Sequence, residues 1–410
     1  MLSVRTWLTF RGTYVAVAGF CYMALPYAVV LVAHAVFLTP VCQANGFTTA
    51  QFSMVYTLTA LSIALTSPYM GRLLGRAPLR LVMTVCAIVT SICFFAFGLA
   101  RRLWQFYALA VLMGVSVTGV TQLPVSMMVT NWFAEKKGLV TGLVFAGGSV
   151  GGFGMMRVVS HLIVSYGYRR CYFLLGLLVM AVTVPLSLFV VCRSPQEVGA
   201  RPFGQPQDAS PAPTTGWTHA QAKKTAAYWL FIAGMALLGT VCAGVQMHIP
   251  AALQSYGYSL RQAAHISSLL SLCSLLGNVL IGAMLDRLGP ARGLWVVALG
   301  LSLSLVCLLY AQTVPVAYLF CALYGLFIPI GGMGPSYLSS ELFGQRDSAA
   351  IFGFVNLFFR LGGAAGPLLS GLMADVYGSY RVAFWLYLGM LLLAFALITL
   401  ALRKRQPPRD

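Results

Sequence analysis

The sequence contains two long apolar runs, GLVTGLVFAGGSVGGFGMMRVVSHLIVS at residues 138–165 and AAIFGFVNLFFRLGGAAGPLLSGLMA at residues 349–374. Each run can cross the hydrocarbon core of a bilayer, which takes about 20 residues of helix. Each also carries one arginine, Arg157 in the first and Arg360 in the second, and neither contains Asp or Glu. Arginine stays charged inside a protein, and a charge in a membrane helix is costly and usually functional. We therefore predict a membrane protein with fixed positive charges in its helices.

The composition extends this prediction to the whole chain. It is 59% hydrophobic and 8% charged, whereas a soluble domain carries about 25% charged residues. Dividing the chain into apolar segments long enough to cross a bilayer predicts an all-α membrane protein with twelve transmembrane helices. The expected spans are 14–38, 49–71, 80–100, 103–128, 138–165, 170–192, 227–253, 261–284, 291–312, 315–338, 348–374 and 382–402.

The net charge of +18 is explained by membrane topology. With an even number of spans both termini share a side, and cytoplasmic termini would place most Lys and Arg residues inside. The basic residues then expected outside are Arg101, Arg102, Arg169, Arg170, Arg261 and Arg381. The lipid bilayer is the expected partner of the basic surface, and no nucleic acid is expected. The cysteines are scattered singly and show no metal-binding spacing, so we expect neither a metal nor a cofactor.

The chain repeats itself at a spacing of 211 residues. The matching pairs are Gly46/Gly257, Gln51/Gln262, Gly71/Gly282, Arg76/Arg287, Tyr107/Tyr318, Gly114/Gly325, Pro124/Pro335, Gly142/Gly353 and Gly151/Gly362. One spacing holds across six spans, which predicts two copies of a six-helix bundle. We expect an N-terminal bundle at 1–192, a Pro-rich cytoplasmic linker at 193–224 and a C-terminal bundle at 225–410.

Residues 282–289, GAMLDRLG, resemble the loop signature of the major facilitator superfamily. The first-half equivalent, residues 71–76, keeps Gly71 and Arg76 but has Gly75 where the family usually has Asp. The resemblance implies two six-helix bundles and a role for these loops in bracing the inward gate. The gating candidates are Gly71, Arg76, Asp286, Arg287 and Gly289. Asp286 is expected to accept hydrogen bonds from a helix N-terminus or an arginine.

Within that superfamily, the motif Asn131-Trp132-Phe133 and the Gly-rich run after Lys137 are similar to the monocarboxylate porters and oxalate:formate antiporters. Relatives of this kind often carry an arginine directly after the glycine that matches Gly277, where this chain has Asn278. The antiporters also carry a basic residue in the eleventh span, where Arg360 lies. The resemblance therefore implies that the binding charge has moved to Arg360.

The substrate-binding candidates are polar or charged residues on the spans expected to line a central cavity. They are Arg360, Asn356, Asn278, Gln122, Tyr27, His248, Gln246, Tyr324 and Arg157. For each, hydrogen bonding between helices is the competing role. Arg157 could instead extend to the outer interface, and His248 is a candidate for proton coupling or an ordinary hydrogen-bonded histidine.

The glycine runs in the fifth and eleventh spans are expected to allow close helix approach. The resemblance implies that these runs form sliding contacts, the fifth span against the eighth and the second against the eleventh.

Together these features predict a secondary transporter that moves a small organic anion, a mono- or short dicarboxylate, by alternating access. Uniport, symport with protons and exchange for a counter-anion all remain open. The alternative is a neutral-solute or drug efflux carrier in which Arg360 is structural. A membrane receptor is disfavoured by the preserved duplication. An enzyme is not expected, since no phosphate-binding loop or nucleophile constellation is present. The compact loops favour a bacterial inner membrane.

Overall fold

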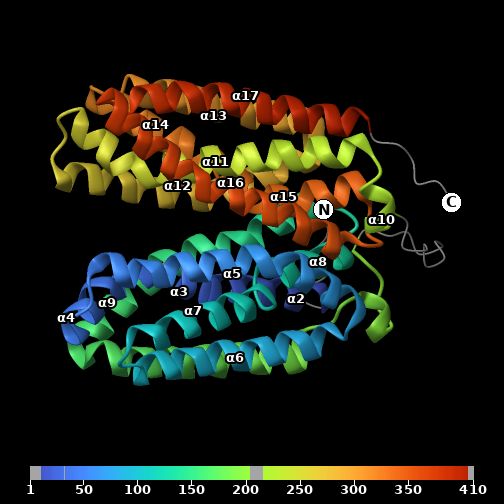
Figure 1. Cartoon of the computed structure of the whole chain (residues 1–410). Helices are drawn as coiled ribbons and strands as arrows, with labels where there is room; N and C mark the ends of the chain where they lie inside the picture. Colours follow the sequence, from blue (N-terminus) through green and yellow to red (C-terminus); the bar gives the residue numbers. More distant parts are fainter. Residues whose placement is uncertain (1–10, 32, 204–215, 405–410) are drawn as a thin grey trace. The chain divides into compact units, whose positions relative to one another are not determined.

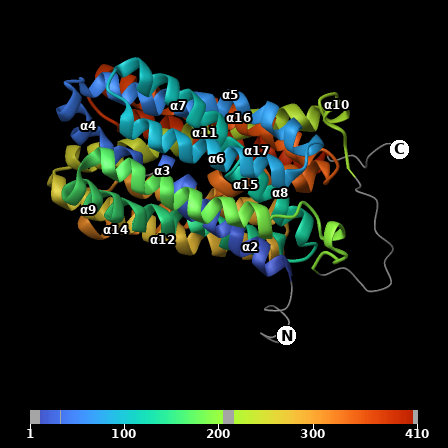
Figure 2. The same cartoon turned by 90° about the horizontal axis from the view of Figure 1, so that it is seen from below.

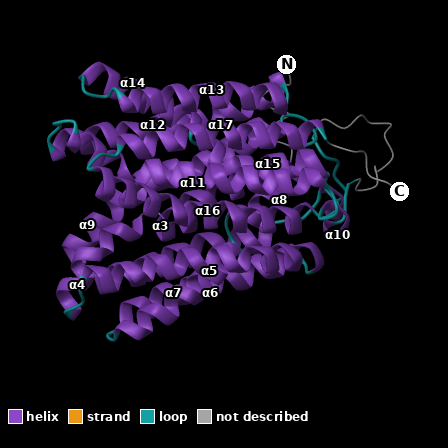
Figure 3. Ribbon diagram, turned by 45° about the horizontal axis from the view of Figure 1, so that its top comes forward, coloured by secondary structure: helices purple, strands orange, loops and turns teal. Residues whose placement is uncertain are grey.

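The structure is a computed structural model that describes residues 11–31, 33–203 and 216–404. The regular elements of these residues are all helices (Figures 1 and 3). The expectation of an all-α membrane protein with twelve spans is confirmed. Contacts divide the chain into two compact units, which are described separately. Unit 1 comprises Met1–Glu135 and Val144–Ser210, and unit 2 comprises Lys136–Leu143 and Pro211–Asp410.

Unit 1 contains the first six spans. Its helices are α2 (Arg11–Tyr22), η1 (Met23–Tyr27), α3 (Ala28–Leu31), η2 (Ala33–Phe37), α4 (Leu38–Asn45), α5 (Thr49–Arg76), α6 (Leu79–Leu99), α7 (Leu103–Thr118), α8 (Gln122–Trp132), α9 (Lys137–Pro185), η3 (Leu186–Val190) and η4 (Pro195–Val198). Helices α5, α6 and α7 pack side by side (Figures 1 and 2). The first turns of α9 belong to unit 2 by their contacts.

Unit 2 contains the remaining spans. Its helices are α10 (His219–Ala222), α11 (Ala226–Ser255), α12 (Leu260–Leu288), α13 (Pro290–Leu309), α14 (Val314–Phe327), α15 (Ile330–Phe343), α16 (Ser348–Tyr377) and α17 (Arg381–Arg403). Helix α11 packs against both α16 and α17, and α14 packs against α12 and α13. Helix α11 is therefore at the centre of this unit.

Ten helices among the described residues are long and apolar enough to cross a membrane. Two features account for the difference from twelve. The segment Lys137–Val190 holds two spans, because Gly167 interrupts it with non-helical angles (φ 78°, ψ 159°). Helix α5 is not among the ten because its Thr, Ser and Arg residues lower its hydropathy.

Prolines break the expected spans locally. Pro26 lies inside the π-helical turn η1. The fourth span divides into α7 and α8 shortly before Pro124, and the tenth divides into α14 and α15 at Ile328 and Pro329. A proline donates no backbone hydrogen bond, so the turn before it must rearrange. Both halves are interrupted in this span but not at equivalent residues, since Pro335, the repeat of Pro124, lies inside α15.

The repeated residues form the same local structures in both units. Thr48 caps α5 in a capping box with Gln51, and Ser259 caps α12 in the same way with Gln262. This box satisfies backbone N–H groups that a helix start leaves without partners. Gly167 and Gly378 both have positive φ, 78° and 65°, at the turns between the last two spans of each half. Glycine adopts this conformation without steric cost.

A helix–helix contact is also repeated. A Cβ on Gly114 of α7 would overlap Thr59 and Ser62 of α5, and a Cβ on Gly325 of α14 would overlap Leu270 and Cys273 of α12. All three positions are 211 residues apart in the two units. The duplication has therefore kept contacts between helices as well as helix ends.

The glycine runs bring backbones together within each unit. Cβ atoms on Gly362 and Gly366 of α16 would collide with the backbone of α11 at Ala236 and Thr240. In unit 1, Gly147 and Gly151 of α9 lie in the same way against Phe20 and Ala24 of the first span. The expected partners, the second span for these α16 glycines and the eighth for these α9 glycines, therefore differ from the observed ones. Gly142 does meet the eighth span, at the backbone of Asn278.

The linker is attached to both units at equivalent positions. Phe203 pairs with Phe133 in a parallel β-bridge, and Gly216 pairs with Gly344 in an antiparallel one. Positions 133 and 344 are again 211 residues apart. Trp217 also donates its backbone N–H to the Phe343 carbonyl at 2.8 Å. Residues 204–215, within the predicted linker, lie outside the described residues.

We predict that Gly362→Ala lowers the apparent Tm of the purified protein by several degrees. The added methyl group would force α16 away from the α11 backbone, and overpacking of this kind costs about 1–3 kcal/mol. The matched control is Gly371→Ala on the same helix, where a Cβ meets no atom within 4 Å. The control should be neutral or slightly stabilising. Equal melting shifts for the two variants would contradict the importance of this contact.

Candidate functional site

Arg360 and Asn356 lie one turn apart on α16, so they share a helix face. Arg360 is partly buried, and Asn356 is 5% exposed. Both residues take part in interactions within the protein. The residue before Arg360, Phe359, packs its backbone against Gly239 of α11. Arg360 is therefore held on a helix whose distance from α11 is fixed by backbone contact.

Asn278 and Tyr324 are buried in unit 2 and bonded to backbone groups. The Asn278 Nδ2 donates to the Ser274 carbonyl of its own helix at 2.8 Å. The Tyr324 hydroxyl donates to the Cys242 carbonyl at 3.2 Å, and the side chain is 1% exposed. These bonds favour a structural role for both residues, Tyr324 as a link between α14 and α11.

The two α11 candidates differ in their surroundings. Gln246 is exposed, whereas His248 is partly buried. The His248 Nε2 lies 3.2 Å from the Pro367 carbonyl of α16, and its ring lies 5.2 Å from that of Tyr380. Facing a carbonyl oxygen, Nε2 must be the protonated, donating nitrogen. This bond links α11 to α16, as expected of a structural histidine.

The unit 1 candidates lie in three different settings. Tyr27 is partly buried, and its ring faces Gly148 of α9. Gln122 is 8% exposed and is the first residue of α8. The exposed Arg157 places its guanidinium 4.2 Å from the centre of the Phe153 ring, one turn earlier on α9. This cation–π contact satisfies part of the charge of Arg157 without an acidic partner.

Asp286 binds the start of α9. Its two carboxylate oxygens accept hydrogen bonds from the backbone N–H groups of Gly138 and Leu139, each at 2.8 Å. The Tyr337 hydroxyl lies 3.5 Å from the same carboxylate. A carboxylate at a helix N-terminus is stabilised by the unpaired N–H groups and the helix dipole. Gly138 and Gly282 must both be glycine, since a Cβ on either would overlap the other's backbone.

The other gating candidates lie at helix ends. Gly289 has φ 78° and joins α12 directly to α13, and Arg287 in the last turn of α12 is exposed. In unit 1, Gly71 is buried and Arg76 is exposed. There the Gly75 carbonyl accepts a hydrogen bond from the Arg193 guanidinium at 2.7 Å. An arginine therefore holds the end of α5, at the position equivalent to Asp286.

The structure brings six of the nine substrate candidates onto packed helices of unit 2. They are Gln246, His248, Asn278, Tyr324, Asn356 and Arg360. Sequence reasoning missed the network in which Tyr387 of α17 bonds to Ser370 and to the Gly366 carbonyl, each at 2.6 Å. It also missed a polar cavity at Arg381. Neither has a local motif, since each depends on contacts between different helices.

A family model described as "Major Facilitator Superfamily" matches residues 15–331 and 249–410. The chain belongs to the major facilitator superfamily. It is therefore a multi-pass membrane transporter, as predicted.

Known relatives resemble the chain at low identity. It is 25% identical to the MFS-type transporter pynF of Aspergillus niger, over 81% of this chain and 73% of that protein. It is 24% identical to monocarboxylate transporter 12 of Rattus norvegicus, over 70% of this chain and 65% of that protein. It is 23% identical to multidrug resistance protein MdtG of Escherichia coli, over 87% of this chain and 85% of that protein. The crystal structure of the MFS transporter FucP in the outward conformation matches this structure with a TM-score of 0.70 and 15% sequence identity. The match covers 95% of this chain and 98% of the FucP chain. This likeness shows the fold.

We predict that Asp286→Asn loosens the start of α9. An amide offers one acceptor oxygen in place of two and has no charge, so one of the two N–H groups loses its partner. Hydrogen bonds to charged groups contribute about 1.5–3 kcal/mol. Hydrogen exchange of the Gly138 and Leu139 amides should become faster. The neighbouring exposed residue provides the control, Arg287→Gln, which should leave exchange unchanged. Unchanged protection in Asp286→Asn would show that the carboxylate does not hold this helix.

Proposed function

We propose that this transporter moves a small organic anion, a mono- or short dicarboxylate, by alternating access. The observation that carries the proposal is Arg360, a permanent positive charge well inside a membrane-spanning helix. It lies on α16 one turn after the buried amide of Asn356. Charged residues in such positions usually mark a substrate or ion path.

Guanidinium chemistry suits a carboxylate substrate. The planar guanidinium can donate two parallel hydrogen bonds to the two oxygens of one carboxylate. Attraction between the charges is strong away from water, although much of it offsets the loss of hydration of both groups. An amide such as that of Asn356 can donate one further hydrogen bond. A cationic drug would instead be repelled by Arg360.

Two relatives support different substrates. Monocarboxylate transporter 12 supports the proposed class by its name. Multidrug resistance protein MdtG, which matches more of this chain, favours the alternative of a drug efflux carrier with a structural Arg360. The alternatives differ in one consequence, which is whether transport depends on the positive charge at position 360.

The proposal also covers how transport is coupled to protons or a counter-anion, and how the protein is oriented in the membrane. A proton relay through a carboxylate is disfavoured, because the sequence places no Asp or Glu within the interior of the expected spans. His248 donates to a helix carbonyl, which leaves Nδ1 as the nitrogen that could accept a proton. Exchange for a counter-anion fits the fixed positive charge of Arg360 within its membrane-spanning helix. The Lys and Arg distribution supports cytoplasmic termini, and the compact loops support a bacterial inner membrane.

We predict that Arg360→Gln abolishes both binding and transport of the anion. The loss of two charge-assisted hydrogen bonds should reduce uptake about 100-fold or more. The substrate should raise the apparent Tm of the wild type and not that of the variant. A thermal-shift screen of small carboxylates, followed by uptake into proteoliposomes, measures both effects.

The matched control for this experiment is Arg292→Gln, which removes an equal charge from an exposed position at the start of α13. It should transport like the wild type. Arg360→Lys keeps the charge but loses the paired donors, so it should retain partial activity. Wild-type transport by Arg360→Gln would support the efflux alternative and refute an anion substrate.

We predict that exchange is faster than net uptake. Without an anion, a partly buried Arg360 makes the change of conformation unfavourable, and a bound anion lowers this barrier. Radiolabelled substrate should enter proteoliposomes preloaded with unlabelled substrate about tenfold faster or more than empty ones. Equally fast uptake into empty vesicles, with no proton gradient, would contradict exchange.

A further inference from the structure

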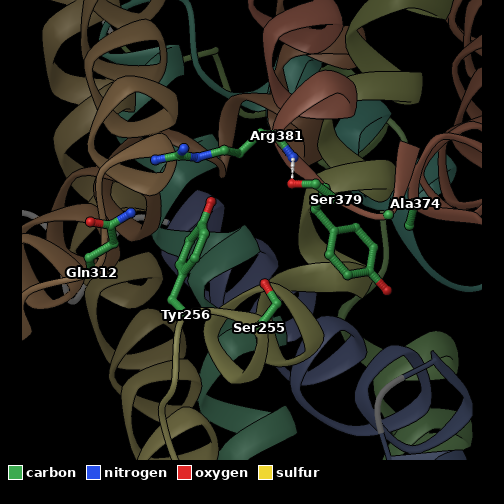
Figure 4. A pocket seen from close by; sticks show the side chains of 8 residues that line it. Ser255, Tyr256, Gln312, Ala374, Ser379 and Arg381 are labelled. Carbon is green, nitrogen blue, oxygen red and sulfur yellow. Dashed lines mark hydrogen bonds between the residues drawn. The ribbon is translucent and has the colours of Figure 1, made fainter. Parts of the chain in front are cut away.

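Unit 2 contains a cavity of about 360 Å³ at the ends of its helices. Its polar lining includes Ser255 and Tyr256 at the end of α11, Gln312 after α13, and Ser379 and Arg381 at the α16–α17 turn (Figure 4). Among the lining residues that the structure describes, Arg381 carries the one formal charge. The cavity volume is within the range of pockets that bind small molecules.

The donors around this cavity are not all used by the protein. Arg381 is exposed, and its Nη2 donates to the Leu309 carbonyl at 3.3 Å. A guanidinium has five N–H donors, so donors remain for a ligand. The hydroxyl oxygen of Tyr256 is buried and makes no hydrogen bond of good geometry, although the Arg381 side chain lies near it. Figure 4 shows the Arg381 guanidinium, the Tyr256 hydroxyl and the Gln312 amide pointing toward one another.

An unbonded buried hydroxyl is unfavourable, because it has lost its hydration without gaining a partner. Burial raises the pKa of Tyr256, and the Arg381 side chain, first as a hydrogen-bond donor and then through its charge, partly offsets this shift. The hydroxyl therefore stays protonated near neutral pH and can donate. Arg381 is also the first residue of α17, where the helix dipole favours an anion.

We propose that this cavity is a second anion-binding site, which captures a small carboxylate before the anion reaches Arg360. Arg381 binds the carboxylate as a charged donor, and Tyr256 and Gln312 add hydrogen bonds. The assignment of a carboxylate rests on the proposed function. The cavity is separate from Arg360, since Ala374 at its edge lies about 20 Å along α16 from that residue, at 1.5 Å per residue.

The lining favours a water-borne acid over a lipid headgroup. Ser255, Gln312 and Ser379 place polar groups around the cavity beside the apolar contributions of Ala374 and Gly378, and such a mixed lining suits a small hydrated ligand. An acyl chain would need an apolar channel beside the charge. The expected orientation, with Arg381 outside, opens the cavity to the external solution.

The test uses the full chain with Arg360→Gln, so that the central site is already disabled. Lactate and succinate are the probes, and saturation-transfer NMR titration in neutral detergent measures their binding. We expect saturable binding of at least one probe. Adding Arg381→Gln should weaken it about tenfold or more, and adding Tyr256→Phe up to about tenfold. Tyr256→Phe removes an unbonded hydroxyl, so folding should be unaffected. Adding Arg292→Gln is the charge control and should change nothing.

Absence of saturable binding in Arg360→Gln, or equal binding after both Arg381→Gln and Tyr256→Phe, would overturn the second site. A repeat in nanodiscs distinguishes the source of the anion. Affinity should be the same in phosphatidylcholine alone and with phosphatidylglycerol. Displacement of the probe by phosphatidylglycerol would assign the cavity to lipid and also overturn the proposal. The proposed function fails differently, through wild-type transport by Arg360→Gln.

Discussion

Close contact between helix backbones is the constraint on which the rest of this structure depends. In a bilayer, helices gain little by burying apolar side chains against each other, because lipid is equally apolar. Packing contacts therefore decide which helices associate. Gly239 of α11 and Gly362 of α16 leave no space for a Cβ between these helices. Arg360 is two residues from Gly362, so the glycines that join the helices also fix the depth and direction of the charge.

The duplication separates what builds the fold from what serves function. The capping boxes at Thr48 and Ser259 are present in both halves, as are the contacts of Gly114 and Gly325. Three charges are not repeated, although the pairs Arg76/Arg287 and Arg170/Arg381 are. The first-half equivalent of Arg360 is Ser149, that of Asp286 is Gly75, and the second-half equivalent of Arg157 is Leu368. The helix caps and the close packing contacts were kept in both halves, whereas Arg360, Asp286 and Arg157 each occur in one half only.

Sequence reasoning predicted the features that depend on local chemistry. Span number, the repeat, and a carboxylate at Asp286 placed to accept hydrogen bonds all follow from composition and motif. It did not predict which helix each glycine run contacts. A helix face made of glycines can pack closely against any neighbouring helix, and the arrangement of helices in the fold decides which neighbour that is. Nor did it predict that Tyr324 and His248 bond to helix carbonyls, since those partners lie on other helices. For a polar residue in a span, the sequence shows which hydrogen bonds its side chain can make but not which helix that side chain faces.

Arg360 and Arg381 of unit 2 lie in different electrostatic environments, and the proposed function assigns each a separate task. Opposite charges about 4 Å apart attract by about 1 kcal/mol in water and about 4 kcal/mol near a protein surface. Arg381 is exposed, so an anion bound there keeps much of its hydration and leaves readily. Arg360 is partly buried, so an anion must lose water to reach it and is then held more strongly. In the proposed mechanism, Arg381 governs how often an anion enters, and Arg360 governs whether it stays bound while the protein changes conformation. An outer site that bound as tightly as the inner one would retain the anion and slow its passage, so the exposure of Arg381 is itself suited to capture.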